Sequence, residues 1–152
     1  MKRFRIILLM LGALFVGLLI GGYLFSDTQP RSFLAANRCE GTCLDRNELF
    51  GLLTSVGVQK FSALIPSVVK ETDKTIVIEH PRPEARIHYL VIPKRDIKNA
   101  GELTEADREY LVDAFKVIRE IVKEQNLVTY RVVTNGPGYQ GVTYMHFHLI
   151  AR

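Results

Sequence analysis

The sequence is poor in the residues that would point to nucleic acid or to a metal cluster. Its 152 residues include only two cysteines and four histidines, and there is no internal repeat or low-complexity segment. Leaving out residues 1–27 removes three basic and one acidic side chain, so that 17 basic and 15 acidic ones remain. No basic run is interleaved with aromatic residues. The composition therefore gives no support for a nucleic-acid partner.

Charge is also missing from one long segment near the N-terminus. Residues 6–25 are a run of 20 without a charged side chain, which as a helix would span about 30 Å, the thickness of a bilayer core. The basic residues of the stub 1–5 predict that it stays in the cytoplasm and that the rest is exported, to the periplasm in a bacterium. The alternative is a cleaved signal peptide, whose apolar region is shorter, about 7–15 residues. We favour a single-pass anchor that binds the lipid bilayer through residues 6–25.

Small residues recur every four positions in this segment, at Ala13, Gly17 and Gly21. Such a stripe lets a second transmembrane helix approach closely, and it would suit a homodimer or a larger membrane complex. Glycine is also common in membrane helices without any partner. Both readings stay open.

The two cysteines, Cys39 and Cys43, are separated by three residues. In an oxidising compartment they could form a short-loop disulfide, which is the reading that we favour. They could instead be two metal ligands or unbonded thiols in a loop.

The remaining chain divides into a linker with a helical extension, residues 26–63, and a domain, residues 64–152. Leucines at helical spacing predict a helix over residues 45–61, and the capping box Thr104-x-x-Asp107 predicts the start of a longer one. Leu111, Phe115, Ile118 and Val122 would form its buried face. Extended segments are expected at 68–69, 75–79, 87–93, 127–134 and 141–152. Strands in pairs with an inserted helix predict an antiparallel α+β sheet with packed helices.

The expected final strand carries half of the histidines. Side chains alternate along a strand, so Tyr144, His146 and His148 would share one face and the apolar residues between them the other. Paired imidazoles on a rigid strand suit nucleophilic or acid–base chemistry near neutral pH. We therefore expect a catalytic site at His146 and His148.

Three segments of the domain resemble the histidine-triad (HIT) family of nucleotide hydrolases and transferases. They are Ile65–Asp73, His88-Tyr-Leu-Val-Ile-Pro-Lys-Arg95, and Tyr130–Asn135 followed by Gln140-Gly-Val-Thr-Tyr-Met-His-Phe-His148. The family signature is His-φ-His-φ-His-φ-φ, where φ is apolar. The resemblance covers residues 64–152 and implies the HIT-like fold, preceded here by the transmembrane helix.

The resemblance also implies roles for individual residues. His146 matches the histidine that attacks the α-phosphate and forms a histidyl-nucleotidyl intermediate, and His148 matches the last histidine of the signature, which hydrogen-bonds a phosphate or leaving-group oxygen. Asn135 and the amides near Gln140 and Gly141 fall where the family binds phosphate. His88 matches an upstream histidine that packs behind the site.

Two positions depart from the family pattern. Tyr144 replaces the first histidine, although its hydroxyl could still donate a hydrogen bond. His80 stands where many relatives place an acidic or amide side chain against the ribose. Some relatives bind zinc through two cysteines, an upstream histidine and the first histidine. Here that set would be Cys39, Cys43, His88 and Tyr144, and because tyrosine is a poor zinc ligand we expect no metal and no cofactor.

Two functions follow from these expectations. The first is a membrane-anchored nucleotide hydrolase or transferase acting on a phosphoramidate or phosphoanhydride, with a nucleotide or a phosphorylated small molecule as ligand. The alternative is a non-catalytic HIT-fold subunit or scaffold of an extracytoplasmic membrane complex. Turnover by the purified protein separates the two.

Overall fold

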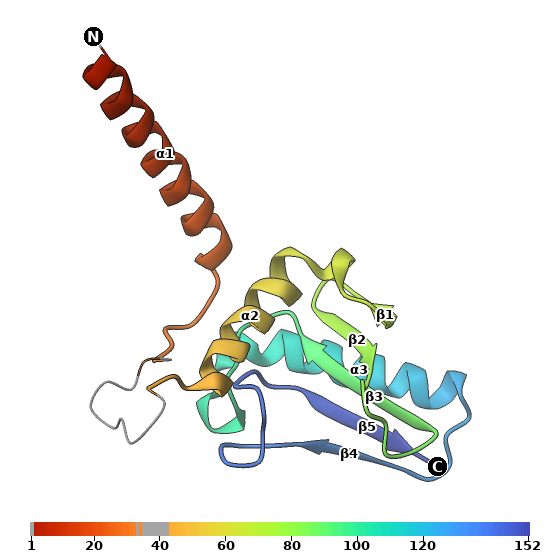
Figure 1. Ribbon diagram of the computed structural model, residues 1–152. Helices are drawn as coiled ribbons and strands as arrows, with labels where there is room; N and C mark the ends of the chain where they lie inside the picture. Colours follow the sequence, from red (N-terminus) through yellow and green to blue (C-terminus); the bar gives the residue numbers. More distant parts are fainter. Residues whose placement is uncertain (1, 33, 35–42) are drawn as a thin grey trace.

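A long N-terminal helix projects away from a sheet that carries one helix on each face (Figure 1). The computed structural model describes residues 2–32, 34 and 43–152. The projecting helix, α1, spans Lys2–Phe25 and buries none of its residues. Within the described residues it is the one helix long and apolar enough to cross a membrane, by length and composition only. The expected apolar segment is therefore helical throughout.

The sheet has five strands, all antiparallel, in the order β1-β2-β3-β5-β4. The α+β fold expected from the sequence is thus confirmed, and two of the strands have the predicted limits. The strands are β1 Val68–Glu71, β2 Thr75–Glu79, β3 Ile87–Pro93, β4 Tyr130–Thr134 and β5 Phe147–Ala151.

The longer helix, α3 (Arg108–Glu124), covers one face of the sheet and closes the main core. Two short 3-10 turns precede it, η2 (Ala100–Glu102) and η3 (Glu105–Asp107), and the predicted capping box is present at Thr104. The expected buried face was partly wrong, because Phe115 is 52% exposed and only its ring edge meets Phe147. The core residues of α3 are Ala114, Val117, Ile118 and Ile121.

The shorter helix, α2 (Arg46–Lys60), belongs to the opposite face, where a smaller apolar cluster forms around Val58, Ile76 and Ile92. The side chain of Asp45 caps it by accepting hydrogen bonds from the next backbone amides. A 3-10 turn, η1 (Ser62–Leu64), follows it. Gly51 packs so closely that a Cβ there would lie 2.4 Å from Oγ1 of Thr143. This contact holds α2 against the segment that leads to β5.

The final strand is shorter than expected, because β5 begins only at Phe147. Residues 141–146 instead form an irregular segment that is bonded to other parts of the chain. The amide of Thr143 donates to Asn47 O of α2, and that of Met145 donates to Ile97 O after β3. Strand β4 likewise begins three residues later than predicted. The expected pair Cys39–Cys43 remains a prediction, since Cys39 lies outside the described residues.

Candidate active site

All four histidines of the chain lie close together at three neighbouring strands, β2, β3 and β5. His80 follows β2, His88 lies in β3, and His146 and His148 lie just before and within β5. The ring centroids of His146 and His148 are 4.9 Å apart, and those of His88 and His148 are 5.2 Å apart. The ring of His80 stacks on that of His88 at 4.0 Å. We call these four residues the histidine group.

One hydrogen bond determines which nitrogen of His146 can react. Its Nδ1 lies 2.7 Å from the carbonyl oxygen of Tyr144, and a carbonyl can only accept, so Nδ1 carries the proton. The lone pair is therefore on Nε2. Burial lowers the pKa of His146 below its ordinary 6.5, while the Tyr144 carbonyl opposes this. A neutral imidazole with its lone pair on Nε2 is the form that a nucleophile needs.

Two consecutive hydrogen bonds orient His148. The amide of Glu84 donates to Nδ1 of His88 at 3.3 Å, which leaves the His88 proton on Nε2. That Nε2 donates to Nδ1 of His148 at 2.9 Å. His148 consequently carries its own proton on Nε2, as a hydrogen-bond donor. Burial, with smaller contributions from the neighbouring histidines, lowers its pKa to about 4, so that it stays neutral at physiological pH.

A cavity of about 560 Å³ opens in front of His146 and His148. Strands β2 and β3, the loop 135–142 and helix α2 contribute its walls, the last through Phe50 and Thr54. An adjoining hollow of about 330 Å³ shares His80, Asn135 and His148 with it and contains His88 and Arg131. The space is in the range of small-ligand sites, and its lining combines apolar side chains with a few polar ones.

The predicted phosphate-binding residues lie around this cavity, but they differ in whether their polar groups are free to bind a ligand. Asn135 reaches His148, with its side-chain amide 3.4 Å from Nε2 of the imidazole, and because that Nε2 carries a proton the amide oxygen is the atom that can accept it. Gly141 lines the wall. Gln140 is buried, its amide donates to Gly136 O, and its side chain donates to Lys98 O. Its N–H donors are thus engaged in shaping the loop, whereas its side-chain oxygen has no hydrogen-bond partner among the described residues.

Tyr144 lines the cavity, but its hydroxyl is not free to donate to a ligand as expected. Only 1% of it is exposed, it belongs to the apolar cluster under α2, and its hydroxyl donates to Pro93 O at 2.8 Å. Since a phenol has one hydrogen to donate, Tyr144 is not free to donate to a ligand. The reason is that residues 141–146 are not a strand, so the alternation of faces does not extend back to position 144.

Zinc bound as in some HIT relatives does not fit this chain, because the position of the fourth ligand is taken by the buried Tyr144. A different set of potential ligand atoms is present at His80, His88 and His148, where one nitrogen of each lies within 4.8 Å of the others. An ion there would have to replace the hydrogen bond between His88 and His148. The hydrogen bonds thus favour the metal-free arrangement.

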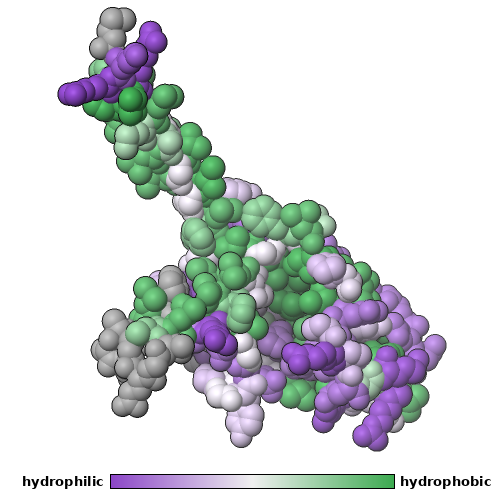
Figure 2. Space-filling model, in the orientation of Figure 1, coloured by the Kyte–Doolittle hydropathy of each residue, from purple (hydrophilic) through white to green (hydrophobic). Residues whose placement is uncertain are grey.

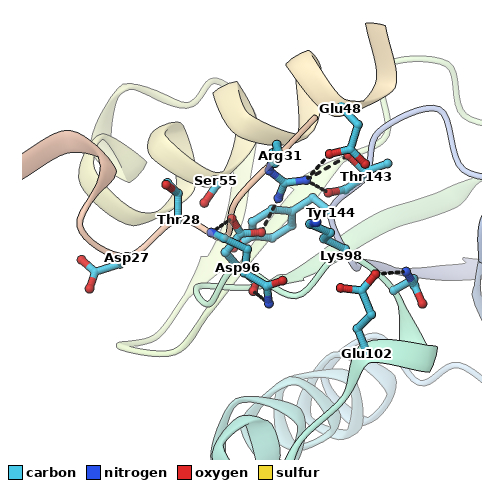
Figure 3. A network of polar contacts seen from close by, with 12 residues as sticks. Asp27, Thr28, Arg31, Glu48, Ser55, Asp96, Lys98, Glu102, Thr143 and Tyr144 are labelled. Atoms are coloured by element: carbon cyan, nitrogen blue, oxygen red, sulfur yellow. Dashed lines mark hydrogen bonds and ion pairs between the residues drawn. The ribbon is translucent and has the colours of Figure 1, made fainter. Parts of the chain in front are cut away.

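A polar network that the sequence did not predict supports the segment before His146 (Figure 3). Arg31 forms an ion pair with Asp96, and both side chains are only 1% exposed. Arg31 also donates to the carbonyl of Thr143 at 2.6 Å and to its hydroxyl at 2.9 Å. The amide of Gln29 donates to the Asp96 carboxylate at 2.8 Å. We call these residues the Arg31 network; Arg31 lies in a segment predicted to be an irregular linker.

Known proteins share this fold and these sequence segments. Residues 63–151, more than half of the chain, match the family described as "Scavenger mRNA decapping enzyme C-term binding". A HIT-like protein of Chlamydia muridarum is 31% identical over 115 residues, which cover 69% of this chain and 91% of that protein. The adenosine 5'-monophosphoramidase of Saccharomyces cerevisiae is 34% identical over 73 residues, 47% of this chain and 44% of that protein. The chain therefore belongs to the histidine-triad family.

Solved structures agree with this assignment. A HIT family hydrolase from Clostridium thermocellum aligns with a TM-score of 0.57 and 28% identity, covering 64% of this chain and 89% of that one. A HIT family hydrolase from Legionella pneumophila gives the same TM-score and identity over 62% of this chain and 88% of that one. The matched part is the sheet domain with its histidine group, and the N-terminal helix lies outside the family match.

Proposed function

We propose that the protein is a membrane-anchored nucleotide hydrolase or transferase in which His146 is the nucleophile. The observation that carries the proposal is the 2.7 Å contact between Nδ1 of His146 and the Tyr144 carbonyl, which leaves the lone pair on Nε2 in a residue that lines the cavity. The yeast relative is named as an adenosine 5'-monophosphoramidase, which supports the same chemistry.

The proposed reaction has two displacements at phosphorus. In the first, Nε2 of His146 forms a bond to the α-phosphorus while the bond to the leaving group breaks. The leaving group keeps the electron pair and, if it is an amine, takes a proton from the solvent. In the second, water or another acceptor attacks, the N–P bond breaks and its electron pair returns to Nε2. His148, with its proton on Nε2, would donate a hydrogen bond to a phosphate oxygen.

The test is hydrolysis of adenosine 5'-phosphoramidate by the full chain in detergent. The wild-type protein should release adenosine monophosphate, and His146→Asn should abolish release. Acid quenching followed by mass spectrometry should find a nucleotidyl adduct on His146. If the folded wild-type protein neither turns over this compound nor forms an adduct with a panel of nucleotides, the enzymatic function is wrong. The non-catalytic scaffold would then be the better account, and the protein should co-purify with a membrane complex.

Anchoring by α1 is part of the same proposal. It is supported by the length and composition of α1 and by the basic residues before its apolar run. The charge bias predicts that the N-terminus is cytoplasmic and that the catalytic domain is outside the cytoplasm. Protease protection in intact cells and in inverted membrane vesicles measures this topology. A mature protein that lacks residues 1–25 would show that α1 is a cleaved signal instead.

A further inference from the structure

Helix α2 packs against the domain with a face made largely of small or polar residues. The residues that it buries are Gly51, Ser55 and Val58, two of which are small or polar. Two of its large apolar residues, Phe50 and Leu53, are exposed instead. Amphipathic helices on globular domains normally bury such residues, and a contiguous exposed apolar surface indicates a contact with something else.

The exposed apolar residues form one stripe along α2 and the turn after it. Phe50 and Leu53 lie one turn apart on α2, while Phe61 follows its last residue and Leu64 ends the 3-10 turn η1. Their exposed fractions are 50% for Phe50, 58% for Leu53, 42% for Phe61 and 78% for Leu64. We call these four residues the α2 stripe. Apolar surface extends from α1 onto the adjoining part of the domain (Figure 2).

One end of the α2 stripe lies at the base of α1. The ammonium group of Lys60 pairs with Asp27 at 2.6 Å and lies 4.7 Å from the ring centroid of Tyr23. The Gln59 side chain also donates to the carbonyl of Asp27 at 3.3 Å. These contacts place the last turn of α2, and therefore Phe61 and Leu64, next to the residue at which α1 ends.

The other end of the α2 stripe lies at the catalytic cavity, because Phe50 and Thr54 are part of its wall. The six residue steps from Thr54 to Lys60 span about 9 Å of helix, which is similar to the thickness of a lipid headgroup layer, roughly 5–8 Å. The apolar surface thus connects the membrane end of α1 with the space in front of His146.

The linker after α1 keeps this arrangement fixed. Gln29 and Arg31 are bonded to Asp96 of the domain, and Arg31 is bonded to Thr143 as well. A domain on a loose tether could sample substrates far from the membrane. Here, the hydrogen bonds start at Gln29, two residues after Asp27, which pairs with Lys60 of α2. The cavity therefore keeps its distance and orientation to the anchor.

We propose that the substrate is a nucleotide joined through its phosphate to a lipid-borne phosphate, and that the apolar chain lies along the α2 stripe while it remains in the bilayer. This inference rests on the proposed function and names its substrate class. Nε2 of His146 would bond to the nucleotide phosphorus while the anhydride P–O bond breaks. The electron pair stays on the lipid phosphate, which leaves in the membrane as a monoester. Water then releases the nucleoside monophosphate from His146.

The experiment compares two probes with the full chain in detergent micelles. One is adenosine 5'-diphosphate esterified to dioleoylglycerol, the other the same diphosphate esterified to glycerol. The lipid form should have a kcat/KM at least about tenfold higher, as expected for burying one or two apolar groups. In Leu53→Glu/Leu64→Glu the ratio of the two values should fall toward 1. The matched control is Val112→Glu, an equally exposed site on α3, which should keep the wild-type ratio.

Each other outcome overturns the inference. Equal rates for the two probes, or a ratio unchanged by the paired substitution, would mean that the α2 stripe does not contact substrate. A dimer that Leu53→Glu/Leu64→Glu converts to monomer with an unchanged ratio would assign the stripe to a second copy. Leu53→Ser/Leu64→Ser provides a milder variant if the charged one unfolds by circular dichroism. Cleavage of adenosine 5'-phosphoramidate distinguishes the two proposals. If the protein cleaves this compound but neither diphosphate, only the lipid substrate is wrong. If the protein does not cleave the phosphoramidate, the proposed function is wrong too.

Discussion

The Arg31 network and the histidine group place polar side chains at the two ends of the same short segment. The network binds the segment at Thr143, and the histidine group begins three residues later at His146. In the network the charges are paired and buried, with hydrogen bonds between groups of the chain itself. In the histidine group, His88 is bonded to His148, and His146 is bonded through Nδ1 to the Tyr144 carbonyl, which leaves its Nε2 with the lone pair.

Buried polar side chains thus have two different roles here: those of the Arg31 network support the structure, and those of the histidine group serve the chemistry. A buried ion pair whose partners are satisfied contributes little net stability, but it is costly to break, so it fixes one arrangement of the chain. Imidazoles with lowered pKa values stay uncharged in a cavity and retain the capacity to bond a ligand. Four changes would sharpen or break this comparison.

The largest effect is expected from His146→Asn. Removal of the nucleophile should lower kcat for adenosine 5'-phosphoramidate by at least about a thousandfold, as for other nucleophilic enzymes. The free energy of unfolding should change little, since the ring makes one hydrogen bond to the backbone. Steady-state kinetics and urea denaturation measure the two quantities. A variant with near-normal kcat would remove His146 from the chemistry.

A loss of stability, rather than of chemistry, is expected from Asp96→Ala. It leaves the buried Arg31 guanidinium with only its longer ion pair, to Glu48 at 3.6 Å, and breaking a buried pair costs about 3–5 kcal/mol. Urea denaturation of the full chain measures the loss. The double variant Arg31→Met/Asp96→Leu should recover part of it, because both fully buried charges are removed while Glu48, 19% exposed, loses its partner. If the single variant is as stable as the wild type, the Arg31 network does not fix the segment.

The histidine group should make the protein sensitive to acid. The pKa of His148 is about 4 in the folded protein, against 6.5 for a free histidine. Between these pH values the unfolded chain binds more protons than the folded one, so stability rises with pH and is lost on acidification from 6.5 toward 4. The melting temperature should fall across this window. In His148→Asn the fall should be shallower; an identical pH dependence would contradict the lowered pKa.

The smallest effect is expected from Tyr144→Phe. The change removes the hydrogen bond to Pro93 O from an apolar cluster and should cost about 1–2 kcal/mol of stability. Because the hydroxyl is engaged there, kcat/KM for the phosphoramidate should stay within about twofold of the wild type. A drop of about tenfold or more with unchanged stability would return Tyr144 to the ligand-binding residues.

Much of the fold follows from local patterns in the sequence. The limits of β2 and β3 were predicted because each is a short apolar run bounded by turn residues. The start of the long helix followed from the capping box at Thr104, which needs only neighbouring residues. Phe115 was misplaced because helical spacing gives a face, whereas the depth of burial depends on what packs against it.

The candidate site, too, was predicted only in part from the sequence. The sequence by itself determined the pairing of His146 with His148 and the family to which the domain belongs. Only the tertiary structure decided that β5 starts at Phe147 and that Tyr144 turns into the core. It also decided that Arg31, more than 60 residues before Asp96 and 112 before Thr143, bonds both. Periodicity and motifs describe neighbours along the chain, while the bonds that stop a strand or hold a linker come from residues that only folding brings together.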